Sequence, residues 1–274
     1  MRLLTFATAS VIAALPLLAR PARGQVPVET ATVKLDLARA KGLPRPKGAV
    51  DLSSFRGRYR YEIACFERLL PVEAHLRRCV DAQRLISGEF HDRLDFVIEP
   101  GGKLKQFSVR RSRDQLQACL LPHVLSLTFP RFKGQSRPFT FQVLVGSPGA
   151  RLGRKTEPTP VDVYPVKTDE ELKRYRMAVF WVFSPWSMAI GRCAEWADQT
   201  VSYGYQVRLA VAITPAGRAR GAVLEVKGKL ADKGAELVAP CVVPFLKGLR
   251  APRHGGSGDV LYRFSTSTAG WGIR

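Results

Sequence analysis

The chain has 274 residues, and 43 Lys or Arg against 23 Asp or Glu give it a formal net charge of +20 at pH 7. A hydrophobic content of 46% is typical of globular proteins, and the length allows two domains of ordinary size. Apart from the N-terminus, no stretch of the sequence is apolar enough to span a membrane, which excludes a multispanning membrane protein.

The N-terminal 24 residues have the pattern of a secretory signal peptide. Arg2 precedes an apolar run over residues 3–19, and Ala22-Arg23-Gly24 provides the small residues of a cleavage site. An uncleaved anchor is the alternative, since an apolar run of 17 residues is at the short limit for a membrane span. Cleavage would remove three arginines and lower the net charge from +20 to +17. We therefore predict an exported protein, periplasmic or secreted.

The segment after the signal peptide is predicted to be a linker or an irregular arm. Residues 25–52 are polar and basic, contain Pro44 and Pro46, and show little periodicity. Residues 58–70 alternate aromatic, charged and apolar side chains and fit either a helix or a strand. Pro71 suits the first turn of a helix, so a helix is expected to begin there.

A hairpin, a second helix and a closing strand follow this first helix. Apolar and polar residues alternate on both sides of Pro100-Gly101-Gly102, and the Pro-then-Gly order suits a turn with a positive φ. The second helix is expected to bury Cys119 and His123 beside its leucines, with Pro122 as a kink. In chain order, the elements are predicted as a helix over 71–79, strands over 89–99 and 103–109, a helix over 114–127 and a strand over 138–145.

This series of elements occurs twice. RYEIACFERLLPVEAHLRRC (residues 60–79) aligns without a gap with RYRMAVFWVFSPWSMAIGRC (174–193), and seven positions are identical. The hairpins and the second helices align in the same order, which indicates a duplicated domain. In the second repeat the strands are predicted over 206–213, 218–226 and 259–265. The predicted boundaries are 53–148 for the first domain, 149–170 for a linker and 171–274 for the second domain.

Five cysteines in an exported protein suggest disulfides, and the duplication helps to select the pairing. Cys79 is equivalent to Cys193, and Cys119 is equivalent to Cys241. The economical pairing lies within each repeat, so the predicted bridges are Cys79–Cys119 and Cys193–Cys241. Cys65 has no counterpart in the second repeat and is expected to be a buried free thiol, with an intermolecular bridge as the alternative.

The order of these residues resembles the AgmX/PglI C-terminal domain, a relative of the TonB C-terminal domain. In the first repeat the matching residues are Cys79, Gly88, Phe96, Ile98, Gly102, Val109, Leu116, Cys119, Phe129, Pro130 and Phe141. The second repeat keeps Cys193, Gly204, Ile213, Gly217, Cys241 and Pro252, but Ala251 replaces the Phe. The resemblance implies an α+β fold of two tandem TonB C-terminal-like domains, each a small antiparallel sheet packed against helices. It also implies a non-enzymatic module of the cell envelope and brings no catalytic residues.

The potentially catalytic side chains form no recognisable active site. The four histidines lie in different elements, none at metal-ligand spacing, and the acidic residues of the 89–99 strand come with no nucleophile or oxyanion motif. The cysteines lack the Cys-x-x-Cys spacing of a redox pair. His75 and His123 each lie four residues from a predicted bridge, so they are expected to approach each other. We predict no enzyme activity, no cofactor and no metal.

Basic residues recur on both hairpins. The candidate contact face consists of Lys103, Lys105, Arg110 and Arg111 in the first repeat, with Arg218 and Arg220 in the second. In an exported protein, a high positive charge favours anionic envelope polymers or lipid head groups over nucleic acid. The alternative is that each hairpin is a solvated edge.

Two functions are therefore expected from the sequence. The first is a binding module that docks another envelope protein by adding a strand to an exposed edge such as Pro138–Val145. The second is a cationic adaptor for anionic envelope polymers or lipid head groups. Docking of a protein should survive moderate salt, whereas binding of a polyanion should be lost steeply as salt rises.

Overall fold

The computed structural model describes residues 28–76, 78–79, 90–110, 114–145, 163–183, 186–201 and 205–267. The fold is α+β, in which antiparallel sheets pack against helices and two disulfides join pairs of helices. The predicted signal peptide (1–24), most of the predicted linker (149–170) and Arg111 lie outside the described residues.

Each repeat forms its own sheet, and the predicted helices and strands are present in both. The first repeat contains α1 (Phe55–Leu69), the 3-10 helix η1 (Leu70–Val72), β2 (Phe90–Ile98), β3 (Leu104–Val109), α3 (Asp114–Leu125) and β4 (Arg137–Val145). The second contains β5 (Val163–Tyr164), α4 (Asp169–Phe183), α5 (Ser187–Val201), β6 (Gln206–Ile213), β7 (Ala219–Gly228), α6 (Ala231–Gly248), β8 (Arg253–His254) and β9 (Val260–Ser267). The segment that fitted either a helix or a strand is helical, as α1.

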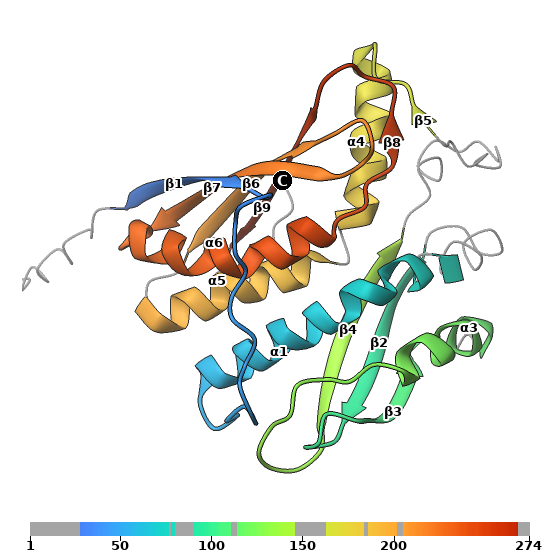
Figure 1. Cartoon of the computed structure of the whole chain (residues 1–274), viewed down its shortest axis with the longest axis vertical. Helices are drawn as coiled ribbons and strands as arrows, with labels where there is room; N and C mark the ends of the chain where they lie inside the picture. Colours follow the sequence, from blue (N-terminus) through green and yellow to red (C-terminus); the bar gives the residue numbers. More distant parts are fainter. Residues whose placement is uncertain are drawn as a thin grey trace, which may run out of the picture.

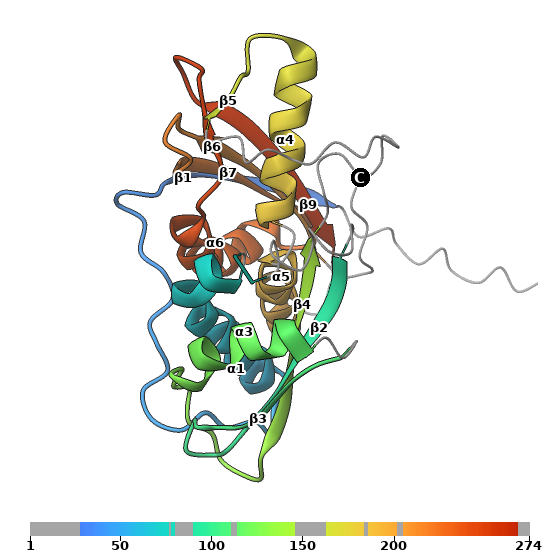
Figure 2. The same cartoon turned by 90° about the vertical axis from the view of Figure 1, so that its right-hand side faces the viewer.

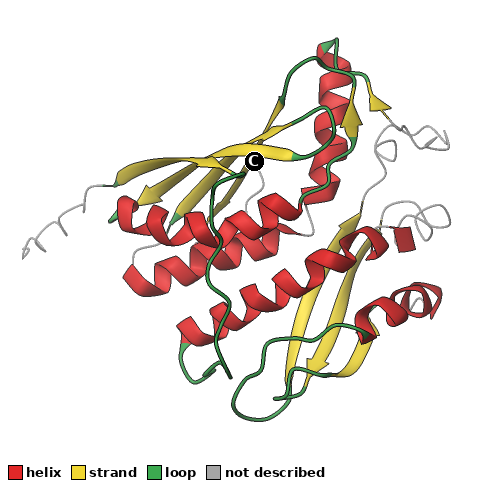
Figure 3. Cartoon of the chain, viewed as in Figure 1, coloured by secondary structure: helices red, strands yellow, loops and turns green. Residues whose placement is uncertain are grey.

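Helices α1, α5 and α6 lie between the two larger sheets. Figure 1 shows one sheet at the top, the other at the bottom, and α5, α6 and α1 between them; the side view keeps the same order of layers. Figure 3 makes the alternation of sheet, helices and sheet visible by colour. A single hydrophobic cluster runs through both repeats, because α1 rests on the first sheet and packs against α5 on its other side. The division into two independent domains stays a prediction.

The strand order is β3-β2-β4 in the first sheet and β1-β7-β6-β9 in the second, where β1 is Glu29–Asp36. β5 and β8 form a separate, short parallel pair. The predicted apolar side of β2 is confirmed, since Leu94, Phe96 and Ile98 are fully buried. In α3, by contrast, the expected burial of Cys119 and His123 is wrong: Cys119 is exposed and His123 is half-buried. Only the row of Leu116, Leu120 and Val124 is buried in α3, whereas Cys119 and His123 face the short helical segment that carries His75 and Cys79.

Part of the predicted arm is a strand. Residues 29–36 form β1, which pairs antiparallel with the edge of β7 and so completes the sheet of the second repeat. The physical reason lies in the alternation of Ala31, Val33 and Leu35 with polar residues, a period of two that suits a half-buried strand. The sequence analysis missed this pattern because the segment is short and lies far from its partner along the chain.

The interface between α1 and α5 contains a charged group. Arg192 of α5 forms an ion pair of 2.7 Å (Nε–Oε2) with Glu62 of α1 and a second one with Glu195. The guanidinium also lies 5.4 Å from the centre of the Tyr59 ring. Burial raises the pKa of Glu62, while the charge of Arg192 partly opposes that shift. This arginine therefore compensates two carboxylates that the contact between the repeats removes from water.

We expect Arg192→Met to lower the free energy of unfolding by about 2 kcal/mol at pH 7, because two half-buried carboxylates lose their counterion. A carboxyl whose pKa is raised by folding stabilises the folded state at pH values below its ordinary pKa of 4.5. This stabilisation is lost as the pH rises through the raised pKa of the folded state. The loss should therefore be smaller near pH 4.5 than at pH 7. Urea denaturation at both pH values measures it. Arg208→Met, which breaks the exposed pair with Glu225, is the control and should change stability by less than about 0.5 kcal/mol.

Candidate functional site: the cationic hairpin and the open edge of the first sheet

The same turn shapes both hairpins. In the first, the Gly102 N–H donates to the Glu99 carbonyl oxygen (2.8 Å) and the Glu99 N–H donates to the Lys103 carbonyl oxygen (2.9 Å). Gly102 has φ +84°, a value that favours glycine. Its carbonyl oxygen accepts from the Phe129 N–H at 2.8 Å, which ties the turn to the segment after α3. Gly217 and Ala251 repeat this contact at 2.9 Å in the second repeat.

The first hairpin presents an exposed cationic group. Lys103, Lys105 and Arg110 are all exposed, and within the described part of the chain none of them takes part in an ion pair. Lys105 is the extra residue of a bulge, since Ile98 pairs with Leu104 and the preceding residue of β2 pairs with position 106. Bulges re-aim side chains and are frequent at sheet edges. The predicted basic face is thus exposed in this repeat.

The basic residues of the second hairpin do not join this face. Arg218 and Arg220 are exposed but belong to the other sheet, and Arg220 forms an ion pair of 2.6 Å with Asp259. Its carbonyl oxygen accepts from the Leu37 N–H at 3.2 Å, next to the strand pairing of β1 with β7. The structure therefore places the predicted basic residues in two separate groups, only one of which lies beside an open strand.

Strand β3 is an edge of its sheet. The Arg110 N–H donates to the Arg93 carbonyl oxygen of β2 at 2.9 Å. Because backbone groups alternate in direction along an antiparallel strand, the N–H groups of Phe107 and Val109 point away from β2. The Val109 N–H meets Oε1 of Gln117 from α3 at 3.4 Å. Within the described residues no strand lies beyond β3, and this open side is the candidate functional site.

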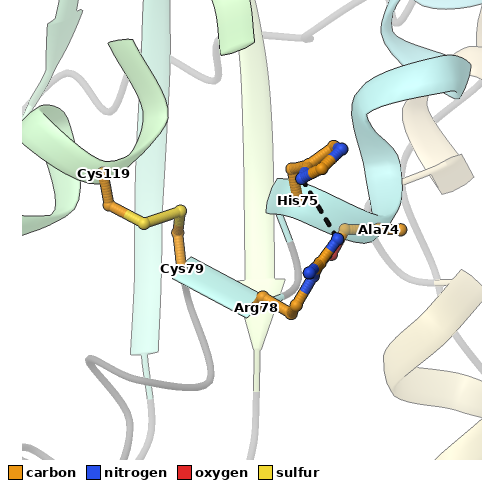
Figure 4. Close-up of a disulfide and its surroundings, with 5 residues drawn as sticks. All are labelled: Ala74, His75, Arg78, Cys79 and Cys119. Atoms are coloured by element: carbon orange, nitrogen blue, oxygen red, sulfur yellow. Dashed lines mark hydrogen bonds between the residues drawn. A yellow bond between two sulfur atoms is a disulfide. The ribbon is translucent and has the colours of Figure 1, made fainter. Parts of the chain in front are cut away.

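The two predicted disulfides are present. Cys79–Cys119 and Cys193–Cys241 have Cα–Cα distances of 5.8 and 5.7 Å, and Cys65 is a buried free thiol, as expected. Figure 4 shows the first bridge, which links the helical turn at Arg78 and Cys79 to α3. Cys119 is exposed, whereas Cys193 and Cys241 are both fully buried.

Two histidines lie beside the first bridge. The expected approach of His75 and His123 is confirmed, since their rings stack with centroids 4.0 Å apart. Arg78 Nη2 lies 3.2 Å from Nδ1 of His75, as the dashed line in Figure 4 marks. Partial desolvation and the neighbouring His123 and Arg78 lower the pKa of His75. His75 is therefore predominantly neutral at pH 7, and the stacked rings pack one helical segment on the other.

The remaining candidates have structural roles. His254 is buried, its Nε2–H donates to the Ile213 carbonyl oxygen at 3.2 Å, and its ring meets Tyr175 edge-on at 4.9 Å. Oδ1 of Asp95 accepts from the Thr140 hydroxyl at 2.7 Å, across β2 and β4. Among the residues that the structure describes, no group of three or more His, Cys, Asp or Glu is placed to hold a metal ion.

A pocket of about 370 Å³ lies where the N-terminal arm passes α1. Arg45, Arg68 and Arg131 line it together with Glu67. Burial raises the pKa of Glu67, and the adjacent arginines lower it in part. This carboxylate offsets some of the positive charge, so the pocket attracts anions less strongly than the open hairpin does.

Sequence reasoning missed the residues that distinguish the two hairpins. β1 and the segment that follows it cover the edge of β7, and they decide which basic group stays open. The signal for β1 was the alternation over residues 29–36, whereas its pairing with β7 had no local signal.

None of the helices in the described ranges combines the length and apolar character that a membrane span requires.

Comparison with known proteins finds no matching family model, no matching curated protein and no matching solved structure.

Proposed function

We propose that the chain is an exported, non-enzymatic binding module of the bacterial cell envelope that docks another envelope protein. The two disulfides support an oxidising compartment, because such bridges persist outside the cytosol. The resemblance of each repeat to the AgmX/PglI C-terminal domain supports a TonB C-terminal-like module. The observation that carries the proposal is that, among the residues that the structure describes, the first sheet ends in unpaired edge strands, β3 on one side and β4 on the other.

Unpaired edges suit strand addition, in which an extended peptide bonds to the free backbone groups of the outer strand. The backbone N–H and C=O of Leu94 point toward β4, because those of its neighbour Arg93 point toward β3. The backbone groups of Phe141, which lies opposite Leu94, therefore point toward β2. Those of the next residue, Gln142, point away from the sheet. The Gln142 N–H is available to a docking strand.

The alternative function is a cationic adaptor for anionic envelope polymers or lipid head groups. The exposed Lys103, Lys105 and Arg110 favour it, because no ion pair neutralises them within the described residues. The two functions differ in their dependence on salt, since screening weakens exposed charge contacts far more than backbone hydrogen bonds and apolar burial.

The test is a pull-down from envelope extract with the protein from Gln25 onward, washed at low and at high salt and analysed by mass spectrometry. A discrete protein that is retained at high salt supports docking. Gln142→Pro should abolish that retention if β4 is the docking edge, since it removes an outward N–H and leaves the bonds to β2 in place. Elution of all bound material at high salt, with glycan or lipid in the eluate, would favour the cationic adaptor instead.

A further inference from the structure

In the described part of the chain, the second sheet has a fourth strand at a position where the first sheet has none. β1 pairs with β7 so that Leu35 lies opposite Ala222 and Val33 lies opposite Leu224. By the alignment of the two turns, Ala222 and Leu224 correspond to Phe107 and Val109 of β3. The position that β1 occupies beside β7 is therefore open beside β3.

The helix behind this position is also uncovered in the first repeat. In the second repeat the arm continues past β1 along α6, where the Leu43 N–H donates to the Pro240 carbonyl oxygen (3.0 Å) and Lys247 Nζ donates to the Ala40 carbonyl oxygen (2.8 Å). Gly42 comes so close that an added Cβ would lie 2.8 Å from Pro244. The arm thus runs along the face of α6 that Pro240, Pro244 and Lys247 form.

The equivalent face of α3 consists of Ala118, Pro122 and Leu125, by the alignment of Cys119 with Cys241. All three are exposed, and Leu125 has 60% of its surface accessible, a large value for an apolar residue. Leu121, on the same side, is half-buried, whereas its counterpart Val243 is buried. An open strand edge therefore lies next to an exposed apolar helix face, and α3 contacts β3 directly.

The open edge of β3 is basic. Lys103, Lys105 and Arg110 border it, and the arm that covers β7 also has a slight excess of basic residues, with Lys34, Arg39 and Lys41 against Glu29 and Asp36. A second basic segment would be repelled there, and the arm of this chain is already paired with β7. An acidic segment, in contrast, would complement the edge.

We propose that the edge of β3 and the adjoining face of α3 (Ala118, Leu121, Pro122 and Leu125) bind an extended acidic segment of a partner protein. The segment pairs with β3 as a fourth strand, as β1 pairs with β7, and then runs along α3. The Phe107 N–H is available to it, and its apolar residues cover Leu125. This inference rests on the proposed function and identifies one edge and one class of partner for it.

Two synthetic peptides test the proposal on the full mature chain. One has the sequence of residues 29–43, and the other carries Lys34→Glu, Arg39→Glu and Lys41→Glu, so the apolar pattern is the same and only the charge differs. The acidic peptide should bind at least about tenfold more tightly at low salt, measured by fluorescence anisotropy. Hydrogen exchange of the complex should show new protection at Phe107 in β3.

Two surface variants locate the site. Leu125→Gln removes the exposed apolar surface without adding a charge, and it should weaken binding of the acidic peptide about tenfold. Lys105→Glu should weaken it by a similar factor. Leu261→Gln, at a 38% exposed position on β9, and Arg218→Glu, on the other hairpin, are the matched controls and should leave the affinity unchanged.

Failure of the acidic peptide to bind, equal binding of both peptides, or protection confined to β4 or β7 would overturn the proposal. The same variants separate it from the proposed function in the pull-down. If Leu125→Gln and Lys105→Glu still retain the envelope protein while Gln142→Pro loses it, the module docks at β4 and the β3 site is wrong. If neither the unmodified chain nor any of the three variants retains a protein at high salt, docking itself is wrong.

Discussion

Replacing Cys193 and Cys241 together with alanine should lower the free energy of unfolding by about 4 kcal/mol. The bridge closes a loop between residues 48 positions apart, and its loss increases the conformational freedom of the unfolded chain. Both cysteines are also fully buried between α5 and α6, so the truncated side chains leave unfilled space in the core. Urea denaturation without reductant measures the change.

The matched control is the double replacement of Cys79 and Cys119. This bridge spans 40 positions, so its loop contribution is nearly the same. Cys119 is exposed, however, and its truncation leaves less empty volume. The variant of the buried bridge should therefore be the less stable of the two. An equal or smaller loss for the buried bridge would show that packing around Cys193 and Cys241 contributes nothing beyond the loop.

Gly217→Ala should destabilise the protein by about 3 kcal/mol, since two separate costs fall on one residue. Its φ of +75° lies in the region that residues with a Cβ rarely adopt, and the added Cβ would lie 2.0 Å from the Ala251 carbonyl oxygen. That oxygen belongs to backbone, so relief requires the turn to move away from the segment after α6. Thermal unfolding followed by circular dichroism measures the effect.

The first hairpin offers a closely matched pair of variants. Gly102→Ala should behave as Gly217→Ala does, since its Cβ would lie 2.2 Å from the Phe129 carbonyl oxygen at φ +84°. Gly101→Ala, one residue earlier, meets no atom within 4 Å and has no positive φ. It should change stability by less than about 0.5 kcal/mol. Similar losses of stability in Gly101→Ala and Gly102→Ala would mean that the whole turn is sensitive to substitution, rather than the close approach at Gly102 alone.

The hairpins and the bridges were predictable because their signals are local or duplicated. A Pro or Gly turn between alternating strands defines each hairpin within about twenty residues, and the two copies of the Cys pattern restrict the pairing to one economical choice. The stacking of His75 on His123 followed from the same bridge. None of these features depends on how the two repeats meet.

The unpredicted features depend on contacts between distant parts of the chain. β1 carries only three inward residues, Ala31, Val33 and Leu35, and its partner strand is β7 of the second repeat. Cys119 was expected to be buried on helical periodicity, but it bonds to the short helical turn at Cys79, which leaves it exposed. The candidate site likewise exists because β1 covers one hairpin and not the other, which no local pattern reveals.

The crossing of β1 into the second sheet makes the two repeats inseparable by a single cut. A peptide bond broken between Val145 and Val163 would leave an N-terminal fragment that still holds one strand of the C-terminal fragment's sheet, an eight-residue ladder with β7. The contact of α1 with α5 would add to it. The two fragments would thus stay joined without a covalent link, because the C-terminal half needs a strand of the N-terminal half to complete its sheet.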